Sequence, residues 1–227
     1  MAYSPAMAVS PNAFVQRHTR LRPVPGVEGI RLHLGDEVLP LWRAVQVAID
    51  DPDAPLPYWA FAWAGGLAIA RHLRVHPELV AGRRVFDLGS GSGLCAIAAM
   101  HAGAATTTGA DIDPYAVAAI SLNARANRVR VAALSDDVLD AGPPDADVIL
   151  AGDCWYEAPL AERVLPWLRL AQARGIEVLV GDPRRRYLPI DDLTLLGSYD
   201  VRTTTELEDL DQKDARVYAL RPADQGS

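Results

Sequence analysis

The chain has 227 residues, half of them hydrophobic, which is enough for one well-buried core but leaves little for a second full domain. Its formal net charge of −7 gives no basic footprint for a phosphate backbone, so composition argues against nucleic acid as an obligatory partner. The two cysteines, Cys95 and Cys154, do not form a stapling pattern, and no apolar run is long enough to span a membrane. We therefore expect a cytoplasmic protein without membrane association.

The N-terminal quarter differs in pattern from the remainder of the chain. Residues 1–13 contain two prolines and no periodicity, so we predict that they are disordered or loosely draped. Residues 14–56 are interpreted as an N-terminal extension with short strand-like runs such as Ile30–Leu34, in which apolar and polar residues alternate. The extension closes with a stretch rich in proline and aspartate that is typical of a loop. The main domain is therefore predicted to span residues 57–222.

Strands and helices alternate along the main domain. The expected order is a helix over 65–76, a strand over 84–88, a helix over 94–101, a strand over 106–111, a helix opening at Pro114, strands over 129–134 and 147–151, a helix over 159–173 and a strand over 176–180. Two further alternating runs, 198–205 and 216–220, predict a terminal antiparallel hairpin. This order predicts an α/β fold with a Rossmann-like, mostly parallel sheet, helices on both faces and a C-terminal antiparallel hairpin.

A glycine loop follows the first of these strands. Gly89, Gly91 and Gly93 lie between the strand and the next helix, where the backbone must turn sharply and approach a ligand closely. The loop does not choose between cofactors, because residues 91–96 also satisfy a dinucleotide-binding pattern. Asp87, just before the loop, would repel a pyrophosphate but attract the ammonium of a methionine moiety. This placement favours S-adenosylmethionine over NAD.

Further acids follow the next two predicted strands. Asp111 is placed to accept hydrogen bonds from both hydroxyls of a ribose, a role that suits either cofactor. Capping of the helix at Pro114 is the alternative role for Asp111 and for Asp113. Asp137 is our choice to accept from the adenine amino group, with Asp136 or a merely solvated loop as alternatives. Together with Asp87 and the terminal hairpin, these acids are typical of class I methyltransferases.

Two motifs carry a more specific resemblance. Residues 57–66 (PYWAFAWAGG) and 152–157 (GDCWYE) resemble the family-16 seven-β-strand methyltransferases, above all the electron-transfer flavoprotein β-subunit lysine methyltransferases and their nicotinamide N-methyltransferase-like bacterial relatives. The likeness extends from about residue 57 to 221. It implies a seven-stranded sheet, S-adenosylmethionine as methyl donor, S-adenosylhomocysteine as product and methylation of a nitrogen, usually that of a protein lysine. The triple arginine 184–186 departs from the family pattern.

The same resemblance extends the list of site residues. Trp63 resembles a family tryptophan that packs near the cofactor, and Ile112 belongs to the Asp-Ile-Asp-Pro motif of the cofactor site. Asp153 and Tyr156 follow the fourth predicted strand, at the sheet edge where ligands of open α/β folds bind. Asp153 is predicted to bind the acceptor ammonium and Tyr156 to steer the amine with its hydroxyl and ring face. The alternatives are a strand-end cap for Asp153 and a core aromatic for Tyr156.

The acceptor itself admits more than one hypothesis. The leading one is a protein with exposed lysines, possibly an electron-transfer flavoprotein β subunit, because the acidic run 206–214 could cradle a basic surface; a merely solvated run is the alternative. The second is a small-molecule amine or nicotinamide-like metabolite. More remote alternatives are an NAD-binding reductase and a cofactor-binding module without catalysis. The histidines show no metal-ligand spacing, so no metal site is predicted.

Overall fold

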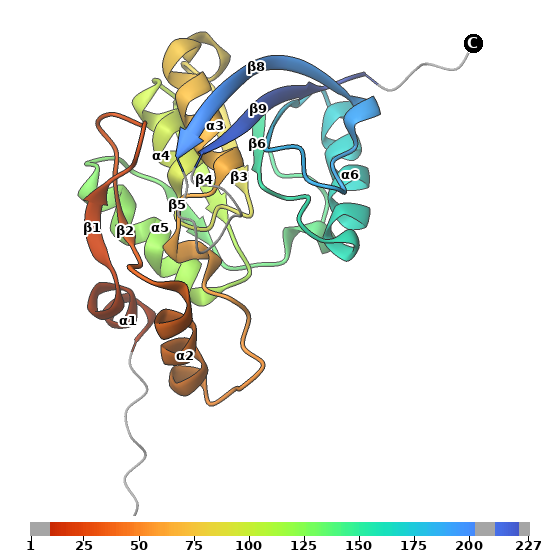
Figure 1. Cartoon of the computed structure of the whole chain (residues 1–227). Helices are drawn as coiled ribbons and strands as arrows, with labels where there is room; N and C mark the ends of the chain where they lie inside the picture. The colour runs from red at the N-terminus through yellow and green to blue at the C-terminus, as the bar shows by residue number, and fades with distance from the viewer. Residues whose placement is uncertain (1–9, 203–211, 223–227) are drawn as a thin grey trace, which may run out of the picture.

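The computed structural model describes residues 10–202 and 212–222 (Figure 1). Its helices are α1 (Pro11–His18), α2 (Val38–Ile49), α3 (Ala64–Val75), α4 (Leu94–His101), α5 (Pro114–Ala126) and α6 (Ala158–Ala173). Its strands are β1 (Arg20–Pro23), β2 (Arg31–Leu34), β3 (Arg84–Leu88), β4 (Thr106–Ala110), β5 (Ala132–Leu134), β6 (Val148–Gly152), β7 (Glu177–Asp182), β8 (Leu193–Arg202) and β9 (Gln212–Leu220). From α3 onward, the elements follow the order that the sequence predicts.

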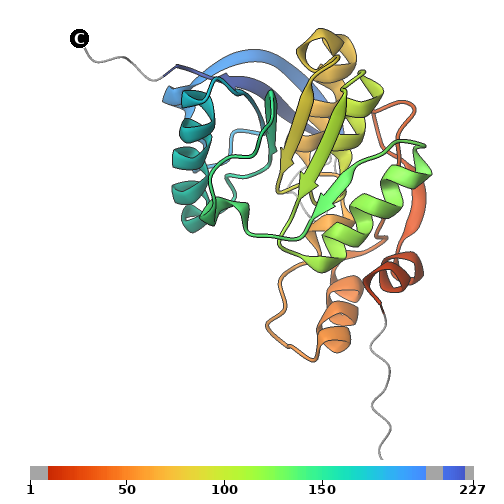
Figure 2. The same ribbon diagram turned by 180° about the vertical axis from the view of Figure 1, so that it is seen from behind.

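Seven strands form one sheet in the order β5-β4-β3-β6-β7-β9-β8. All contacts among β3 to β7 are parallel, whereas β9 runs antiparallel to both of its neighbours. This confirms the predicted Rossmann-like sheet with its terminal hairpin. The strand order reverses at β3, since β4 lies on one side of it and β6 on the other. Figures 1 and 2 show the parallel strands pointing toward the end of the molecule where α2 lies.

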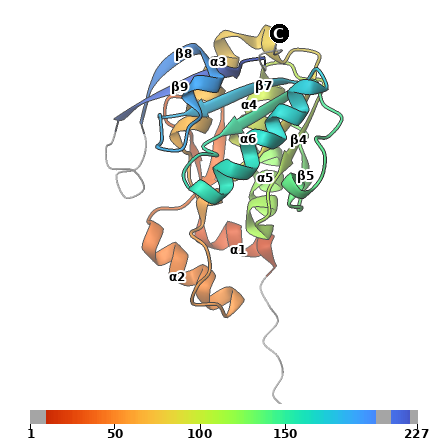
Figure 3. The same cartoon turned by 90° about the vertical axis from the view of Figure 1, so that its right-hand side faces the viewer.

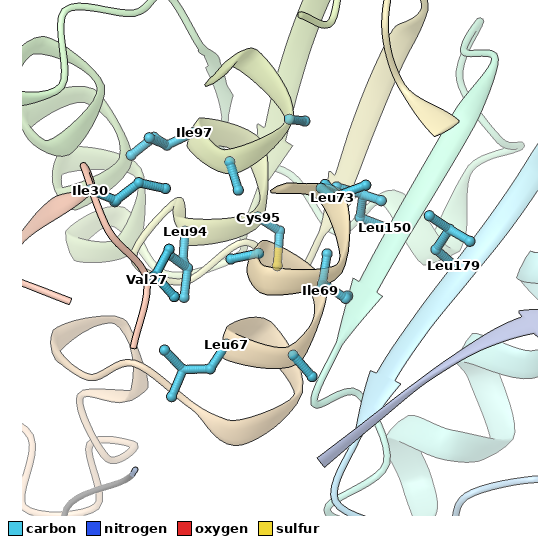
Figure 4. Close-up of a cluster of buried hydrophobic side chains, with 14 of the residues drawn as sticks. Val27, Ile30, Leu67, Ile69, Leu73, Leu94, Cys95, Ile97, Leu150 and Leu179 are labelled. Atoms are coloured by element: carbon cyan, nitrogen blue, oxygen red, sulfur yellow. The ribbon is translucent and has the colours of Figure 1, made fainter. Parts of the chain in front are cut away.

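Both faces of the sheet are buried at its centre, because successive side chains of a strand point to opposite faces and nearly all residues of β3, β6 and β7 are buried. On β6, Val148 and Leu150 belong to the cluster under α3 and α4, whereas Ile149 and Ala151 belong to the cluster under α6. Figure 4 shows Leu150 and Leu179 beside the side chains of α3 and α4, with Cys95 between these two helices. Figure 3 is viewed from the side of α6. The predicted helical cover of both faces is confirmed.

The N-terminal extension packs against α5. Asn127 accepts a hydrogen bond from Arg31 N at 2.9 Å, and Asn123 accepts one from His33 N at 2.7 Å, which holds β2 to the helix. The ring of Phe14 in α1 lies 4.7 Å from that of Tyr115. The extension therefore shares the core of the main domain, while the boundary at residue 57 stays a prediction.

Two local predictions are wrong, and one helix is missed. Residues 11–13 form the first turn of α1, with Ser10 Oγ accepting from Ala13 N, so the predicted loose segment ends earlier. The sequence also misses α2, whose Pro40 is tolerated because it lies in the first turn, where the proline nitrogen needs no helical partner. The strand predicted over 129–134 is confined to Ala132–Leu134, because Val129 N still bonds Ala124 O at the end of α5.

Other expectations concern the chain ends and the terminal hairpin. Glu206, Glu208, Asp209 and Asp211 of the predicted acidic run lie outside the described residues, whereas Asp214 pairs with Arg216 at 2.7 Å. Within 10–202 and 212–222, no helix is long and apolar enough to cross a membrane.

Candidate functional site

A cleft of about 980 Å³ lies at the carboxyl ends of the parallel strands. The loops after β3, β4, β5 and β6 form one side of it, and α2 with the turn Tyr58–Ala60 forms the other. Because the strand order reverses between β4 and β6, the loops at this edge diverge and leave room for a ligand. The volume is in the range of small-molecule and cofactor sites.

The glycine loop after β3 has the conformation that its composition predicts. Gly89, Gly91 and Gly93 have φ angles of 59°, 52° and 83°, in the left-handed region where other residues are strained. A Cβ on Gly93 would also lie 3.3 Å from the Cα of Ile120. Ser90 N donates to Ala110 O at 2.9 Å and fixes the loop to β4. All three predicted glycines line or shape the same wall of the cleft.

Asp87 is buried beneath this loop and only 1% exposed. Its Oδ2 accepts hydrogen bonds from Ser90 Oγ at 2.6 Å and from Ala96 N, in the first turn of α4, at 3.1 Å. Burial raises the pKa of Asp87 to about 7, although these two hydrogen bonds oppose the shift. The carboxyl group therefore organises the loop and also lines the cleft, where a positively charged ligand would stabilise its ionised form.

Asp111 lies at the end of β4 and contacts the same loop. Its two oxygens accept from Gly91 N at 2.9 Å and from Asp113 N at 3.0 Å, and burial raises its pKa. Asp113 itself caps α5 by accepting from Tyr115 N at 2.7 Å, so the capping role foreseen for Asp113 is confirmed. Ile112 is 71% exposed and lines the cleft. Both Asp111 and Ile112 are thus at the predicted cofactor wall.

The loop after β5 places Asp136 and Asp137 in the lining of the cleft. Asp137 accepts from Leu139 N at 3.2 Å and pairs with Arg163 at 2.9 Å. The predicted contact of Asp137 with the adenine amino group stays a prediction, and the Asp137 carboxylate would have to accept from both the adenine and Arg163. Asp136 is exposed in the same lining.

Three aromatic rings, those of Tyr58, Trp63 and Tyr156, line one part of the cleft, which we call the aromatic end. The ring of Tyr58 lies 5.4 Å from that of Tyr156 and 5.6 Å from that of Trp63, and Trp63 Nε1 donates to Tyr58 O at 2.8 Å. Tyr58 and Tyr156 are 39% and 43% exposed, so this end is open to solvent. The sequence predicts Trp63 and Tyr156 as site residues but misses Tyr58. Its only signal was the crowding of aromatic residues over 58–63.

Asp153 lies between the aromatic rings and the sheet. Its oxygens accept from Gly65 N at 3.0 Å and Gly66 N at 2.8 Å, two of the free amides in the first turn of α3, and the carboxylate also pairs with Arg185. This is a capping contact made across 88 positions of sequence rather than at the strand end. Asp153 lines the cleft, but its carboxylate already has three partners, and its predicted contact with an acceptor ammonium stays a prediction.

Comparison with known proteins identifies the family. A family profile of ribosomal protein L11 methyltransferase matches residues 74–152. The electron transfer flavoprotein beta subunit lysine methyltransferase of Xenopus laevis is 34% identical over 223 residues, covering 95% of this chain and 89% of the frog protein. The chain belongs to this methyltransferase family.

Other members and solved structures agree with this assignment. The human member is 40% identical over 131 residues, a match that covers 57% of this chain and 50% of the human protein. A putative RNA methyltransferase from Pyrococcus horikoshii has the same fold, with a TM-score of 0.53, 14% identity and coverage of 75% of this chain and 91% of that one. So does magnesium protoporphyrin IX methyltransferase from Synechocystis with bound S-adenosylmethionine, with a TM-score of 0.50, 16% identity and coverage of 69% and 77%. The chain is an S-adenosylmethionine-dependent methyltransferase, as the sequence predicts.

The residues of the cleft fit this cofactor. The left-handed glycines leave the loop backbone open toward the cleft, since a Cβ on Gly91 would meet nothing closer than 3.8 Å. Asp87 and Asp111 place two carboxyl groups in this wall, which would suit an ammonium and a ribose and would repel a dinucleotide pyrophosphate. Trp59 also lines the cleft, and its buried Nε1 has no acceptor among the described residues. When bound, S-adenosylmethionine supplies a methyl group activated on a sulfonium.

Cofactor affinity of this methyltransferase should rise with pH. Burial raises the pKa of Asp87 to about 7, and a nearby ammonium favours the ionised carboxylate, so binding below that pH releases a proton. The logarithm of the affinity should therefore climb with a slope of up to about one as the pH rises toward about 7. Calorimetry with S-adenosylhomocysteine measures this slope. Asp87→Asn should flatten it, and a flat wild-type profile would contradict the role of Asp87.

The same shift predicts how stability depends on pH. The folded pKa of Asp87 lies above its unfolded value, so the folded state binds the extra proton. This contribution to stability is complete below about pH 4 and is lost as pH rises through about 7. In thermal melts, S-adenosylhomocysteine should stabilise the protein more at the upper end of this range.

Proposed function

We propose that this methyltransferase modifies lysine side chains of a protein, with an electron transfer flavoprotein beta subunit as the substrate. The observation that carries the proposal is the solvent-open aromatic end of an acidic cleft. The relatives of this chain from frog and human are named electron transfer flavoprotein beta subunit lysine methyltransferase, and a nematode relative is named as a homolog of that enzyme. We include a cytoplasmic location in the proposal, supported by two buried cysteines without a disulfide.

The charge of the cleft favours a cationic acceptor. Among the described residues, seven carboxyl groups line it, against three basic side chains. Arg163 pairs with Asp137 and Arg185 pairs with Asp153, so these ion pairs offset part of the negative charge locally. Such an excess of negative charge in a partly buried cleft attracts cations and raises their local concentration. This negative charge would attract both a lysine ammonium and the positive charges of the cofactor.

The aromatic end offers a second means of recognising a cation. An ammonium near the faces of Tyr58, Trp63 and Tyr156 would be attracted by the rings, more strongly where water is partly excluded. Glu157 follows Tyr156 directly and lines the cleft. Burial raises the pKa of Tyr58 and Tyr156, and the charge of Glu157 raises both further, so its carboxylate lies near these rings. A long, flexible lysine side chain can reach this end from the surface of a folded protein.

The chemistry required of the protein is modest. The amine lone pair attacks the methyl carbon, the carbon–sulfur bond breaks, and its electron pair stays on sulfur as the thioether of S-adenosylhomocysteine. The lysine must first lose a proton, which leaves to water at the open end of the cleft. Burial and the nearby Glu157 raise the pKa of Tyr156, so its hydroxyl remains neutral and acts as a hydrogen-bonding group rather than as a base.

Labelling of a bacterial lysate tests the proposal. The purified enzyme is added with methyl-labelled S-adenosylmethionine, and the lysate is then separated into protein, RNA and small-molecule fractions. The proposal predicts label in discrete protein bands and on lysine after digestion. Label confined to small molecules would support the metabolite alternative, and label in RNA would contradict the predicted absence of nucleic-acid substrates.

The aromatic end can be tested with a single variant. Tyr58→Ala removes a ring from the aromatic end, which is the proposed acceptor end of the cleft, and leaves the glycine loop unchanged. Methyl transfer to protein should therefore fall at least about tenfold, while the affinity for S-adenosylhomocysteine stays within about threefold. Tyr58→Phe is the matched control, because it keeps the ring and should keep most of the activity. Equal losses in the two variants would assign the effect to the hydroxyl instead.

A further inference from the structure

A buried charge cluster lies beneath the acceptor end of the cleft. It consists of Asp153, Asp182 and Arg185, whose side chains are 12%, 0% and 19% exposed. Arg185 N donates to Asp182 Oδ1 at 2.6 Å, and its Nη1 lies 3.4 Å from Asp182 Oδ2 and also contacts Asp153 Oδ1. A single arginine thus bridges two carboxylates that the ends of β6 and β7 bring together.

The Asp153 carboxylate connects Arg185 to the first turn of α3. Its carboxylate accepts from Gly65 N and Gly66 N, while its own N donates to Gly181 O at 2.9 Å. Asp153 also has a φ of 59°, a strained conformation that persists only where its surroundings fix it. Asp153 therefore joins the ends of β6 and β7 to the first turn of α3.

The start of α3 in turn positions the aromatic rings. Trp63 directly precedes the helix, donates to Tyr58 O and packs against the Tyr58 ring. Tyr156 lies three residues after Asp153, and its ring packs against that of Tyr58. The position of the Asp153 carboxylate thus helps to fix the two rings that contact Tyr58.

We propose that Arg185 is a positioning residue for methyl transfer, which holds Asp153 in place and thereby fixes the acceptor end of the cleft. This inference rests on the proposed function for its kinetic readout. An arginine suits the position because its planar guanidinium can donate to two carboxylates from fixed directions. Without it, the like charges of Asp153 and Asp182 would face each other in a buried site. The pKa of Asp182 is already raised to about 6 by burial and Asp153, and Arg185 opposes that shift.

The cofactor end is held by separate contacts. Asp87 fixes the glycine loop through Ser90 and Ala96, and Asp111 fixes it through Gly91. None of these hydrogen bonds involves Arg185, Asp153 or Asp182. Loss of Arg185 should therefore disturb the acceptor end and leave cofactor binding largely intact.

Paired arginine variants test this separation. Arg185→Gln should lower kcat/KM for purified electron transfer flavoprotein beta subunit by about 30-fold, while the Kd of S-adenosylhomocysteine stays within about threefold. Arg185→Lys keeps the charge and should recover part of the loss. Arg186→Gln is the control, because it removes the same charge from the adjacent, exposed residue, and it should behave as wild type.

A second measurement keeps the test independent of the substrate. Amide hydrogen exchange at Gly65 and Gly66 should accelerate in Arg185→Gln but not in Arg186→Gln, while exchange at Ala96 stays unchanged. If wild-type enzyme leaves the beta subunit unmethylated, the proposed function fails and the exchange data alone decide on Arg185. If Arg185→Gln does not fold, Arg185→Lys decides by the same readouts. Wild-type kcat/KM with wild-type exchange, or equal losses of cofactor affinity and turnover, would overturn the inference.

Discussion

Replacing Gly65 by alanine should lower the free energy of unfolding by about 3 kcal/mol. A Cβ at this position would lie 2.1 Å from Gly181 O and 2.7 Å from Asp153 Oδ2. The first contact is with the backbone of a central strand, which cannot move without disturbing the pairing of β7 with β6 and β9. Urea denaturation followed by circular dichroism measures the loss.

The neighbouring glycine provides a matched control. A Cβ on Gly66 would make only ordinary contacts, at 3.7 Å from Cys95 Sγ and Leu94 Cδ2. Gly66→Ala should therefore change stability by less than about 1 kcal/mol, and the better helix propensity of alanine favours a gain. A tolerated Gly65→Ala, or equal losses in both variants, would contradict the close approach of α3 to β7.

Replacing Asp111 by alanine should weaken S-adenosylhomocysteine binding by about 100-fold. This is the effect expected from losing charge-assisted hydrogen bonds to a ribose, at a total of about 3 kcal/mol. The variant also frees Gly91 N and Asp113 N from their acceptor, so the glycine loop loses one of its supports. Isothermal calorimetry at pH 7 measures the change directly.

Asp113→Asn is the control for charge alone. Asparagine is as good a helix cap as aspartate, so the contact to Tyr115 N and the start of α5 are kept while one negative charge leaves the same wall. Its cofactor affinity should stay within about threefold of wild type. If the two variants bind equally, the contribution of Asp111 is electrostatic and the proposed ribose contact is wrong.

The sequence predicts the central strands because they are short apolar runs bounded by clear turns. Residues 85–88, 148–151 and 178–180 are buried, so side chains of both strand faces are apolar there. The two helices of the extension were harder to foresee. Helix α2 carries a proline in its first turn and exposes Leu39 and Val47, so its pattern lacks a clean polar face.

The cofactor end of the cleft was predicted better than the acceptor end. Gly89, Gly91 and Asp111 lie close together in sequence and adjacent strands, so local spacing suffices to relate them. Tyr58 and Tyr156 are nearly a hundred positions apart, and only the fold brings their rings to 5.4 Å. For the same reason, no sequence pattern could show that Asp153 caps α3.

The structure distinguishes the three arginines of residues 184–186. Arg184 has a φ of 69°, a left-handed conformation that favours glycine. Arg185 turns inward to Asp153 and Asp182, and the guanidinium of Arg186 lies 5.6 Å from the ring of Tyr187. Of these three arginines, Arg185 is therefore the one that contacts the acids beneath the cleft.

The most direct test of the account is mass spectrometry of the acceptor. Purified electron transfer flavoprotein beta subunit is incubated with the enzyme and S-adenosylmethionine, then digested and sequenced by fragmentation. The account predicts added methyl groups on lysine side chains with wild-type enzyme and a strongly reduced yield with Asp111→Ala. An unmodified beta subunit, in the presence of enzyme that binds S-adenosylhomocysteine tightly, would contradict it.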